Sequence, residues 1–201
     1  MFSSIVVAGV GGQGTLLASK ILSEAAQKRG FFVRTSETIG MAQRGGSVSS
    51  HIRIGSQDVS PVIPIRHADI LIGFELAEAA RQLNRLKPDA CAVVNTDCII
   101  PTNVALRQGE YHCDGYLSAI KNNIGRGYYI NALPLAIRAG DARTLNIVLL
   151  GFSVGAGILP FEEDEIRGAM ECCIKPRLLE INRKAFNMGA EEAIKQIKMC
   201  R

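Results

Sequence analysis

Several features that mark other classes of protein are missing from this sequence of 201 residues. It has no Cys-x-x-Cys pair, so its cysteines offer neither a zinc knuckle nor the ligand run of a ferredoxin cluster. It has no long basic run, and its net charge is only +4, so nucleic-acid binding is not indicated. The longest apolar stretch, residues 147–159, is too short to cross a bilayer. These absences predict a soluble cytoplasmic protein with no nucleic-acid or membrane partner.

A secretory leader is also not evident, because the first apolar run has no basic segment before it and stops at glycines. A chain of this size without such a leader is not expected to depend on disulfides. Two adjacent cysteines, Cys172 and Cys173, lie in a helical pattern, where one of them should face the core. We expect all six cysteines to be thiols in a reducing compartment: Cys91, Cys98, Cys113, Cys172, Cys173 and Cys200.

What is present is an ordinary globular composition, with 47% hydrophobic and 21% charged residues. The length predicts a single domain over residues 1–201, large enough to bury a core without metal or disulfide. Apolar runs at residues 5–8, 69–74 and 90–95 are typical of buried strands, and helical patterns separate them. The alternation predicts a Rossmann-like, doubly wound α/β fold with a mostly parallel sheet and C-terminal helices.

The order of the patterns gives more detail. A helix over residues 15–29 and a strand over residues 31–35 complete a βαβ opening. The alternation from Ser47 predicts a half-exposed strand, compatible with an antiparallel direction, with His51 on its exposed side. Further along, residues 141–158 are predicted to form one long apolar helix.

A glycine-rich loop lies between the first strand and the first helix. Gly9, Gly11 and Gly14 satisfy G-x-G-x-x-G in the context that gives this pattern its meaning. Gly9 permits the tight turn, Gly11 lets backbone approach a phosphate, and Gly14 lets the helix pack closely. The unpaired amides of the helix N-terminus would attract an anion, and the side chains of Gln13 and Thr15 add donors. The alternative is a loop that is rich in glycine for packing or subunit contact alone.

A second unusual stretch, MAQRGGSVSS, begins at Met41. Arg44 beside Gly45 and Gly46 would suit a second cradle, with the guanidinium binding phosphate or carboxylate. An equally good interpretation is a turn that leads into the strand from Ser47. Asn95, Thr96 and Asp97 follow another strand, at the position where open α/β sheets place binding loops.

A nicotinamide cofactor would need an acid after the second strand, and Glu37 lies at roughly that distance from Gly14. Catalytic residues for a dehydrogenase are missing, because no Tyr-x-x-x-Lys pair follows. His51, His67 and His112 have no acid or nucleophile at a motif spacing, so we interpret each as solvated or structural.

Three stretches together resemble one known family. They are GVGGQG after the first strand, MAQRGGSVSSHIRIG after the second and ADILIGFELAEA at the next. The C-terminal KPRLLEINRKAFNMG is similar to that family's ending, so the resemblance covers almost the whole chain. The family is that of the gamma subunits of 2-oxoacid:ferredoxin oxidoreductases, and the sequence is most similar to the small (beta) subunits of the indolepyruvate type.

The resemblance implies a place in a complex that oxidatively decarboxylates a 2-oxoacid, acylates coenzyme A (CoA) and reduces ferredoxin. It implies that thiamine diphosphate with Mg²⁺ and the 4Fe–4S clusters belong to the large alpha subunit. It also associates this chain with CoA binding and with the subunit interface, and gives it no catalytic residue or metal ligand. The residues that match the family's two motifs are Gly9, Gly11, Gly12, Gln13, Gly14, Arg44, Gly45 and Gly46.

Three other classes of function compete with this one. An independent NAD(P)-dependent dehydrogenase would use the glycine loop and Glu37. An adenylate-forming activator shares a G-x-G-G-x-G loop, but such proteins generally carry paired zinc-binding cysteines that are absent here. An adaptor subunit would have the same loop with no ligand in it.

Overall fold

The computed structural model describes residues 2–40, 45–100 and 113–199. These residues include a mixed sheet of six strands. Along the sheet the strands follow the order β2-β3-β1-β4-β5-β6. The run from β1 through β4 and β5 to β6 is parallel, whereas β3 is antiparallel to both of its neighbours. The strands are β1 (Ser3–Val10), β2 (Phe32–Ile39), β3 (Ser47–Gly55), β4 (Ala68–Gly73), β5 (Leu86–Asn95) and β6 (Arg126–Ile130).

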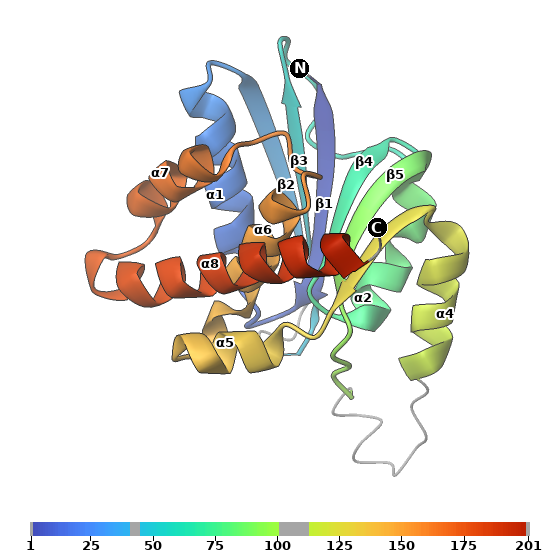
Figure 1. Cartoon of the computed structure of the whole chain (residues 1–201). Helices are drawn as coiled ribbons and strands as arrows, with labels where there is room; N and C mark the ends of the chain where they lie inside the picture. Colours follow the sequence, from blue (N-terminus) through green and yellow to red (C-terminus); the bar gives the residue numbers. More distant parts are fainter. Residues whose placement is uncertain (1, 41–44, 101–112, 200–201) are drawn as a thin grey trace.

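Helices cover both faces of the sheet, as the sequence predicts (Figure 1). One face packs on α1 and α6, with α5, α7 and α8 outside them, and this side holds the larger hydrophobic core. The other face packs on α2 and α4 around a smaller core. The helices are α1 (Thr15–Lys28), α2 (Leu76–Arg81), α4 (Cys113–Asn123), α5 (Leu133–Ala139), α6 (Leu145–Gly155), α7 (Glu163–Cys173) and α8 (Pro176–Met199), with short 3₁₀ turns η1 (Leu83–Arg85) and η2 (Ala142–Thr144).

The central helix of the larger core is α6, whose sequence is apolar on every side. Every residue of α6 from Leu145 to Val154 is buried, as expected for a helix with no polar face. Helices α6 and α8 approach each other closely. A Cβ added at Gly151 of α6 would overlap the carbonyl of Phe186 in α8. A Cβ added at Gly189 of α8 would overlap the carbonyl of Val148 in the same way. Glycines on both helices therefore let α8 lie across α6 (Figure 1).

The predicted βαβ opening is present, but β3 lies between its two strands. The antiparallel direction of β3 agrees with its sequence pattern, whereas the predicted half-exposed face is wrong. Ser49 and His51 are buried because β3 is an interior strand and the segment that contains Ile63 packs on this second face. His51 was expected on the exposed side, yet its Nδ1 accepts a hydrogen bond of 3.1 Å from the amide of Ile63.

The helix predicted over residues 141–158 is shorter than expected. The Asp141 carboxylate accepts a hydrogen bond of 2.8 Å from the amide of Arg143. Asp141 thereby caps the 3₁₀ turn η2, and the α-helix does not begin here. The α-helical part, α6, starts at Leu145, and Gly157 with a φ of 64° follows its end. Helix α5, which precedes η2, was not predicted, because it has only 7 residues and shows no long apolar period.

The expectation that all cysteines are thiols is also wrong. Cys98 and Cys113 form a disulfide, with their Cα atoms 6.1 Å apart. The pair was missed because its partners are 15 residues apart, and only the packing of α4 on α2 brings the start of α4 back to the end of β5. Cys173 packs against the larger core while Cys172 is exposed, which confirms that one of these two faces inward. Within the described residues, no helix is long and apolar enough to cross a membrane.

Candidate functional site

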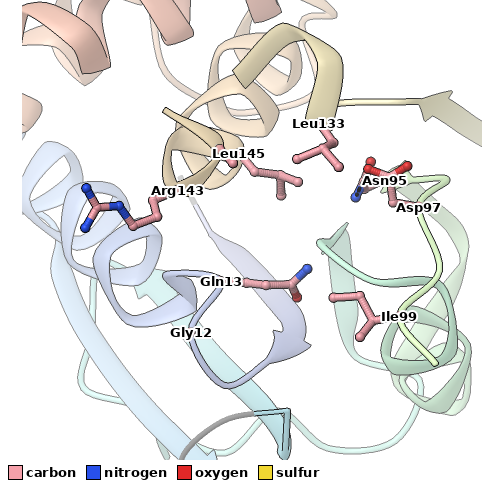
Figure 2. A pocket seen from close by; sticks show the side chains of 9 residues that line it. Gly12, Gln13, Asn95, Asp97, Ile99, Leu133, Arg143 and Leu145 are labelled. Carbon is pink, nitrogen blue, oxygen red and sulfur yellow. Dashed lines mark hydrogen bonds between the residues drawn. The ribbon is translucent and has the colours of Figure 1, made fainter. Parts of the chain in front are cut away.

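A pocket of about 240 Å³ opens at the edge of the sheet where the parallel strands end (Figure 2). The glycine loop after β1 forms one wall, and the segment after β5 forms the opposite wall. The start of α5 and the η2–α6 junction close it from above in this view. Its lining residues are Gly12, Gln13, Asn95, Asp97, Ile99, Leu133, Ala142, Arg143 and Leu145.

Gln13 organises the loop through both ends of its amide. Its Oε1 accepts a hydrogen bond of 2.8 Å from the amide of Val10, and its Nε2 donates one of 3.1 Å to the carbonyl of Phe74. A Cβ added at Gly9 would lie 2.7 Å from Gln13 Oε1 and 3.0 Å from the Cβ of Phe74. Gly9 is therefore required so that the Gln13 side chain can fold back under the loop. Thr15, which opens α1, is buried beside it.

Two further loop glycines have backbone angles that favour glycine. Gly12 has a φ of 101° and Gly14 a φ of 79°, both in the region that L-residues rarely adopt. A Cβ at Gly12 would meet nothing within 4 Å, whereas one at Gly14 would overlap the side-chain amide of Asn146. That amide donates 3.1 Å to the Gly14 carbonyl, so Gly14 serves the close approach of α6. Gly12 faces the pocket instead.

In the part of the chain that the structure describes, the N-terminus of α1 has no side-chain cap. Gly14 occupies the N-cap position, no side chain there accepts a hydrogen bond, and the first turn carries no acidic residue. The amides of Thr15, Leu16 and Leu17 precede the first intrahelical donor, Ala18, and so have no partner within the helix. The N-terminus also carries a partial positive charge from the aligned peptide dipoles. This end of α1 is suited to bind an anionic group.

The two sequence motifs meet through their backbones. Gly11 donates a hydrogen bond of 2.8 Å to the carbonyl of Gly46 and accepts one of 3.2 Å from the amide of Gly45. The amide of Gly11 therefore braces the β2–β3 connection and is not free to bind an anion. Gly45 and Gly46 do not line the pocket, and Arg44 lies outside the described residues.

Asn95 and Asp97 lie where the sequence places a binding loop, and they line the pocket opposite Gln13. Asn95 is fully buried, and its Nδ2 donates to the carbonyl of Phe74 at 3.0 Å. Its Oδ1 accepts a hydrogen bond of 3.0 Å from the amide of Ala132. Asn95 thus joins the ends of β4, β5 and β6.

Two buried acids in the FELAEA stretch support these walls. The Glu75 carboxylate accepts hydrogen bonds from the amides of Glu78, at 2.9 Å, and Ile99, at 3.3 Å. Burial raises the pKa of Glu75 above its ordinary value. Glu78 accepts a hydrogen bond of 2.6 Å from the hydroxyl of Ser47, at the start of β3. Glu75 therefore positions the segment after β5, and Glu78 positions the hairpin behind the glycine loop.

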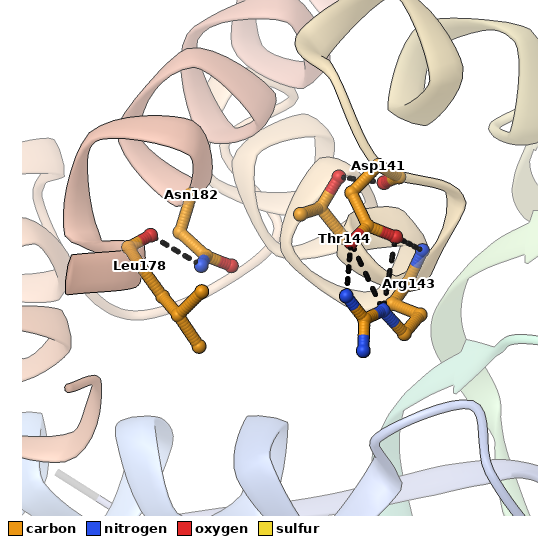
Figure 3. Close-up of polar contacts among 5 residues, drawn as sticks. All are labelled: Asp141, Arg143, Thr144, Leu178 and Asn182. Carbon is orange, nitrogen blue, oxygen red and sulfur yellow. Dashed lines mark hydrogen bonds and ion pairs between the residues drawn. The ribbon is translucent and has the colours of Figure 1, made fainter.

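Arg143 is a pocket residue that the sequence did not reveal. It belongs to η2, where the Asp141 carboxylate holds its guanidinium at 2.6 Å and where Thr144 donates 2.7 Å to the Asp141 carbonyl (Figure 3). Asn182 of α8 lies beside this turn and donates to the Leu178 carbonyl at 2.7 Å. The Arg143 side chain is 83% exposed and points away from Asn95 in Figure 2. Its position above the loop depends on tertiary packing, so no local pattern could have shown it.

Comparison with known proteins gives the family. The model of the pyruvate ferredoxin/flavodoxin oxidoreductase family matches residues 4–192. The chain belongs to this family. It is 39% identical over 193 residues to the indolepyruvate oxidoreductase subunit IorB of Archaeoglobus fulgidus, and the match covers 95% of both chains.

Solved structures agree with this family assignment. The gamma subunit of the keto/oxoacid ferredoxin oxidoreductase of Geobacter sulfurreducens superposes with a TM-score of 0.69 at 25% identity, over 96% of this chain and 99% of its own. The 2-oxoglutarate:ferredoxin oxidoreductase of Magnetococcus marinus, solved with CoA and succinyl-CoA, has the same fold in 31% of its longer chain. That similarity has a TM-score of 0.73 at 20% identity, over 96% of this chain. This chain is thus a small subunit of the 2-oxoacid:ferredoxin oxidoreductase family.

The described histidines of this oxidoreductase subunit do not line the pocket. Among the described residues, no group of three or more His, Cys, Asp or Glu side chains could hold a metal ion. His51 is buried and hydrogen-bonded to Ile63, and the Nδ1 of His67 lies 2.7 Å from the carbonyl oxygen of Ile65, two residues before it. His112 lies outside the described residues.

Glu37, the acid expected to bind a nicotinamide ribose, does not reach the pocket. It pairs with Ser50 in the middle of the β2–β3 ladder, and Ser50 pairs in turn with Val7 of β1. The side chain of Glu37 lines a different cavity, beside Lys20 and Cys173. This placement removes the feature that favoured a dehydrogenase.

Proposed function

We propose that the chain is the small, non-thiamine subunit of an indolepyruvate-type 2-oxoacid:ferredoxin oxidoreductase. The complex would convert an arylpyruvate and CoA to the acyl-CoA and carbon dioxide, with reduction of ferredoxin. The indolepyruvate oxidoreductase relative, which matches along nearly the whole chain, supports this substrate class. In this proposal thiamine diphosphate, Mg²⁺ and the 4Fe–4S clusters belong to the large partner subunit.

The role proposed for this chain is to bind CoA. The observation that carries the proposal is the uncapped N-terminus of α1, which opens beside a pocket at the carboxyl edge of the sheet. A pyrophosphate would accept hydrogen bonds from the amides of Gly12 and of residues 14–17, whereas the amide of Gln13 already donates to the carbonyl of Val10 at 3.1 Å. The pocket beside these amides has the apolar side chains of Ile99, Leu133 and Leu145, which suit the uncharged parts of CoA. The CoA-bound oxidoreductase of Magnetococcus marinus, which shares the fold, supports this ligand.

A matched pair of substitutions at Gly12 tests the binding site. Both Gly12→Asp and Gly12→Asn put a side chain of the same size at a φ of 101°, where space is open. Only the aspartate adds a negative charge beside the amides. We expect Gly12→Asp to raise the Kd for CoA roughly tenfold above that of Gly12→Asn, an effect of one charge near a binding anion. Isothermal titration of the complex assembled with its large subunit measures both values.

The same experiment separates this proposal from an adaptor role. If the two variants assemble with the large subunit and bind CoA as tightly as the wild type, the loop holds no CoA and serves the interface alone. The adaptor hypothesis has one supporting observation, because the amide of Gly11 is already engaged by Gly46. Oxidation of indolepyruvate with CoA and a viologen acceptor, measured with and without this chain, tests the activity of the complex.

A further inference from the structure

A second cluster of reactive side chains lies at the opposite end of α1 from the glycine loop. The Nζ of Lys28, the last residue of α1, donates a hydrogen bond of 3.1 Å to the Sγ of Cys172 near the end of α7. Lys28 also donates 3.0 Å to the carbonyl of Gly168 and lies 3.8 Å from the Glu24 carboxylate. Cys172 is exposed, so a soluble reagent can reach its sulfur.

This pair joins a nucleophilic sulfur to a nucleophilic nitrogen at contact distance. The thiolate is the reactive form of cysteine. Neither side chain is enclosed, because Cys172 is exposed and the Lys28 side chain is 46% exposed, so a substituent on the sulfur has room in the solvent. None of the residues in this cluster belongs to the CoA pocket.

We propose that Cys172 and Lys28 form an acyl-relay modification site, at which an acyl-CoA thioester acylates the cysteine and the acyl group then moves to the lysine. The Cys172 thiolate attacks the thioester carbonyl carbon, a carbon–sulfur bond to Cys172 forms, and the bond to the CoA sulfur breaks. The departing CoA thiolate takes a proton from the Lys28 ammonium. The resulting amine attacks the new thioester, the amide forms, and the proton it loses returns to the released Cys172 sulfur. No electrons are transferred.

The order of these steps follows from the charges. The pKa of Lys28 is raised, first by its hydrogen bond to Cys172 and further by Glu24 and Glu171, so the free lysine is protonated. Acylation of Cys172 turns its sulfur into a thioester sulfur, which is a poor hydrogen-bond acceptor, and so removes this first cause. Lys28 therefore loses its proton more readily once the acyl group is on Cys172. The neutral amine is the form that attacks the thioester. The reacting atoms also start within the distance at which intramolecular reactions are greatly accelerated.

Acylation would change the contact between two helices. An amide at Lys28 carries no positive charge, so it loses the attraction to Glu24 and cannot donate in the same way to Gly168. The bridge between α1 and α7 would be weakened at the end of α1 opposite the glycine loop. In the cell, the acyl-CoA would be the product of the complex, and this point rests on the proposed function. Acylated Lys28 would then report that the product has accumulated.

The test uses the full chain, added acetyl-CoA and quantitative peptide mass spectrometry. Lys184 is the internal control, because it is exposed and pairs with Glu180 at the same i,i+4 spacing as Lys28 with Glu24. We expect Lys28 to be acetylated at least roughly tenfold faster than Lys184, as a proximity effect predicts. Cys172→Ala should reduce the rate at Lys28 to that at Lys184, whereas Cys173→Ala should leave it unchanged.

Lys28→Arg gives a second readout, since the acyl group should then stay on Cys172 as a thioester that hydroxylamine removes. Equal rates at Lys28 and Lys184, or a rate at Lys28 that Cys172→Ala does not change, would overturn the proposal. Because Cys172 is exposed, these variants should fold, and their thermal unfolding is checked beside the wild type.

The acetyl-CoA is added to the protein, so Lys28 of the Gly12→Asp variant should be acetylated normally even if this variant no longer binds CoA in the complex. Failure of the relay and failure of the proposed function therefore give different results.

Discussion

The side-chain amides of Gln13 and Asn95 donate to the same acceptor, the carbonyl oxygen of Phe74, at 3.1 and 3.0 Å. Gln13 comes from the loop after β1 and Asn95 from the end of β5, while Phe74 follows β4, the strand between them. One carbonyl therefore ties the two walls of the pocket together. The distance between the glycine loop and the opposite wall depends on this contact.

Asn95→Asp removes the buried donor while it keeps the oxygen that accepts from Ala132. We expect a loss of about 3 kcal/mol or more in unfolding free energy at neutral pH, because the buried carboxylate would face the Phe74 carbonyl and Asp97. Burial raises the pKa of the new carboxyl, so the loss should shrink as the pH falls and the group is protonated. Urea unfolding at several pH values measures both effects.

Gln13→Glu is the matched control, since it removes the other donor to Phe74 from a side chain that is only partly buried. It should cost about 1 kcal/mol, because water can still reach the carboxylate. Equal losses for the two variants would show that burial of Asn95 does not set the size of the effect.

Gly14 should tolerate a side chain much less well than Gly12. Both have positive φ, so alanine costs about 1–2 kcal/mol at either position from backbone strain. At Gly14 the added Cβ also overlaps Asn146, which should add about 1–3 kcal/mol. Thermal unfolding of Gly14→Ala and Gly12→Ala tests the difference. Adding Asn146→Ala to Gly14→Ala should narrow the gap, and an unchanged gap would argue against the overlap.

His51 should make the protein less stable in acid. Burial, with a smaller effect of Arg85, lowers the pKa of His51 from 6.5 to about 4. The unfolded chain binds the proton first, so this contribution to stability is complete above pH 6.5 and is lost as the pH falls to about 4. The loss should be on the order of 3 kcal/mol. His51→Gln removes the titrating group, so its stability should change less over this pH range than that of the wild type, as chemical unfolding can show.

Reduction of the Cys98–Cys113 disulfide should destabilise the chain. A link across about 15 residues restricts the unfolded chain and contributes about 3 kcal/mol in the chain-entropy description. We expect dithiothreitol to lower the melting temperature of the wild type and to leave that of the Cys98→Ser, Cys113→Ser double variant unchanged. The same fall in both proteins would show that the reductant acts elsewhere. Thiol titration of the denatured protein before and after reduction counts the two sulfurs directly.

Much of the candidate site was predictable because its determinants are local. A buried apolar run, a glycine loop and an amphipathic helix follow one another along the chain, so the sequence predicts β1, the loop and α1 with small errors in their bounds. The position of Asn95 and Asp97 was also predictable, since the carboxyl ends of parallel strands meet at one edge of a sheet. The two glycine motifs meet through backbone hydrogen bonds, whereas their roles in ligand binding, including that of Arg44, stay predictions.

Other features were decided only when the chain folded. The sequence alone determined the elements, their approximate order and the nature of the loop, because each depends on residues a few positions apart. Tertiary structure decided that β3 enters between β1 and β2, which buries His51, and that η2 brings Arg143 to the pocket. It also brought Cys98 to Cys113 and Cys172 to Lys28, 144 residues away. Such pairings depend on which surfaces pack best over the whole molecule, and local periodicity carries no information about that choice.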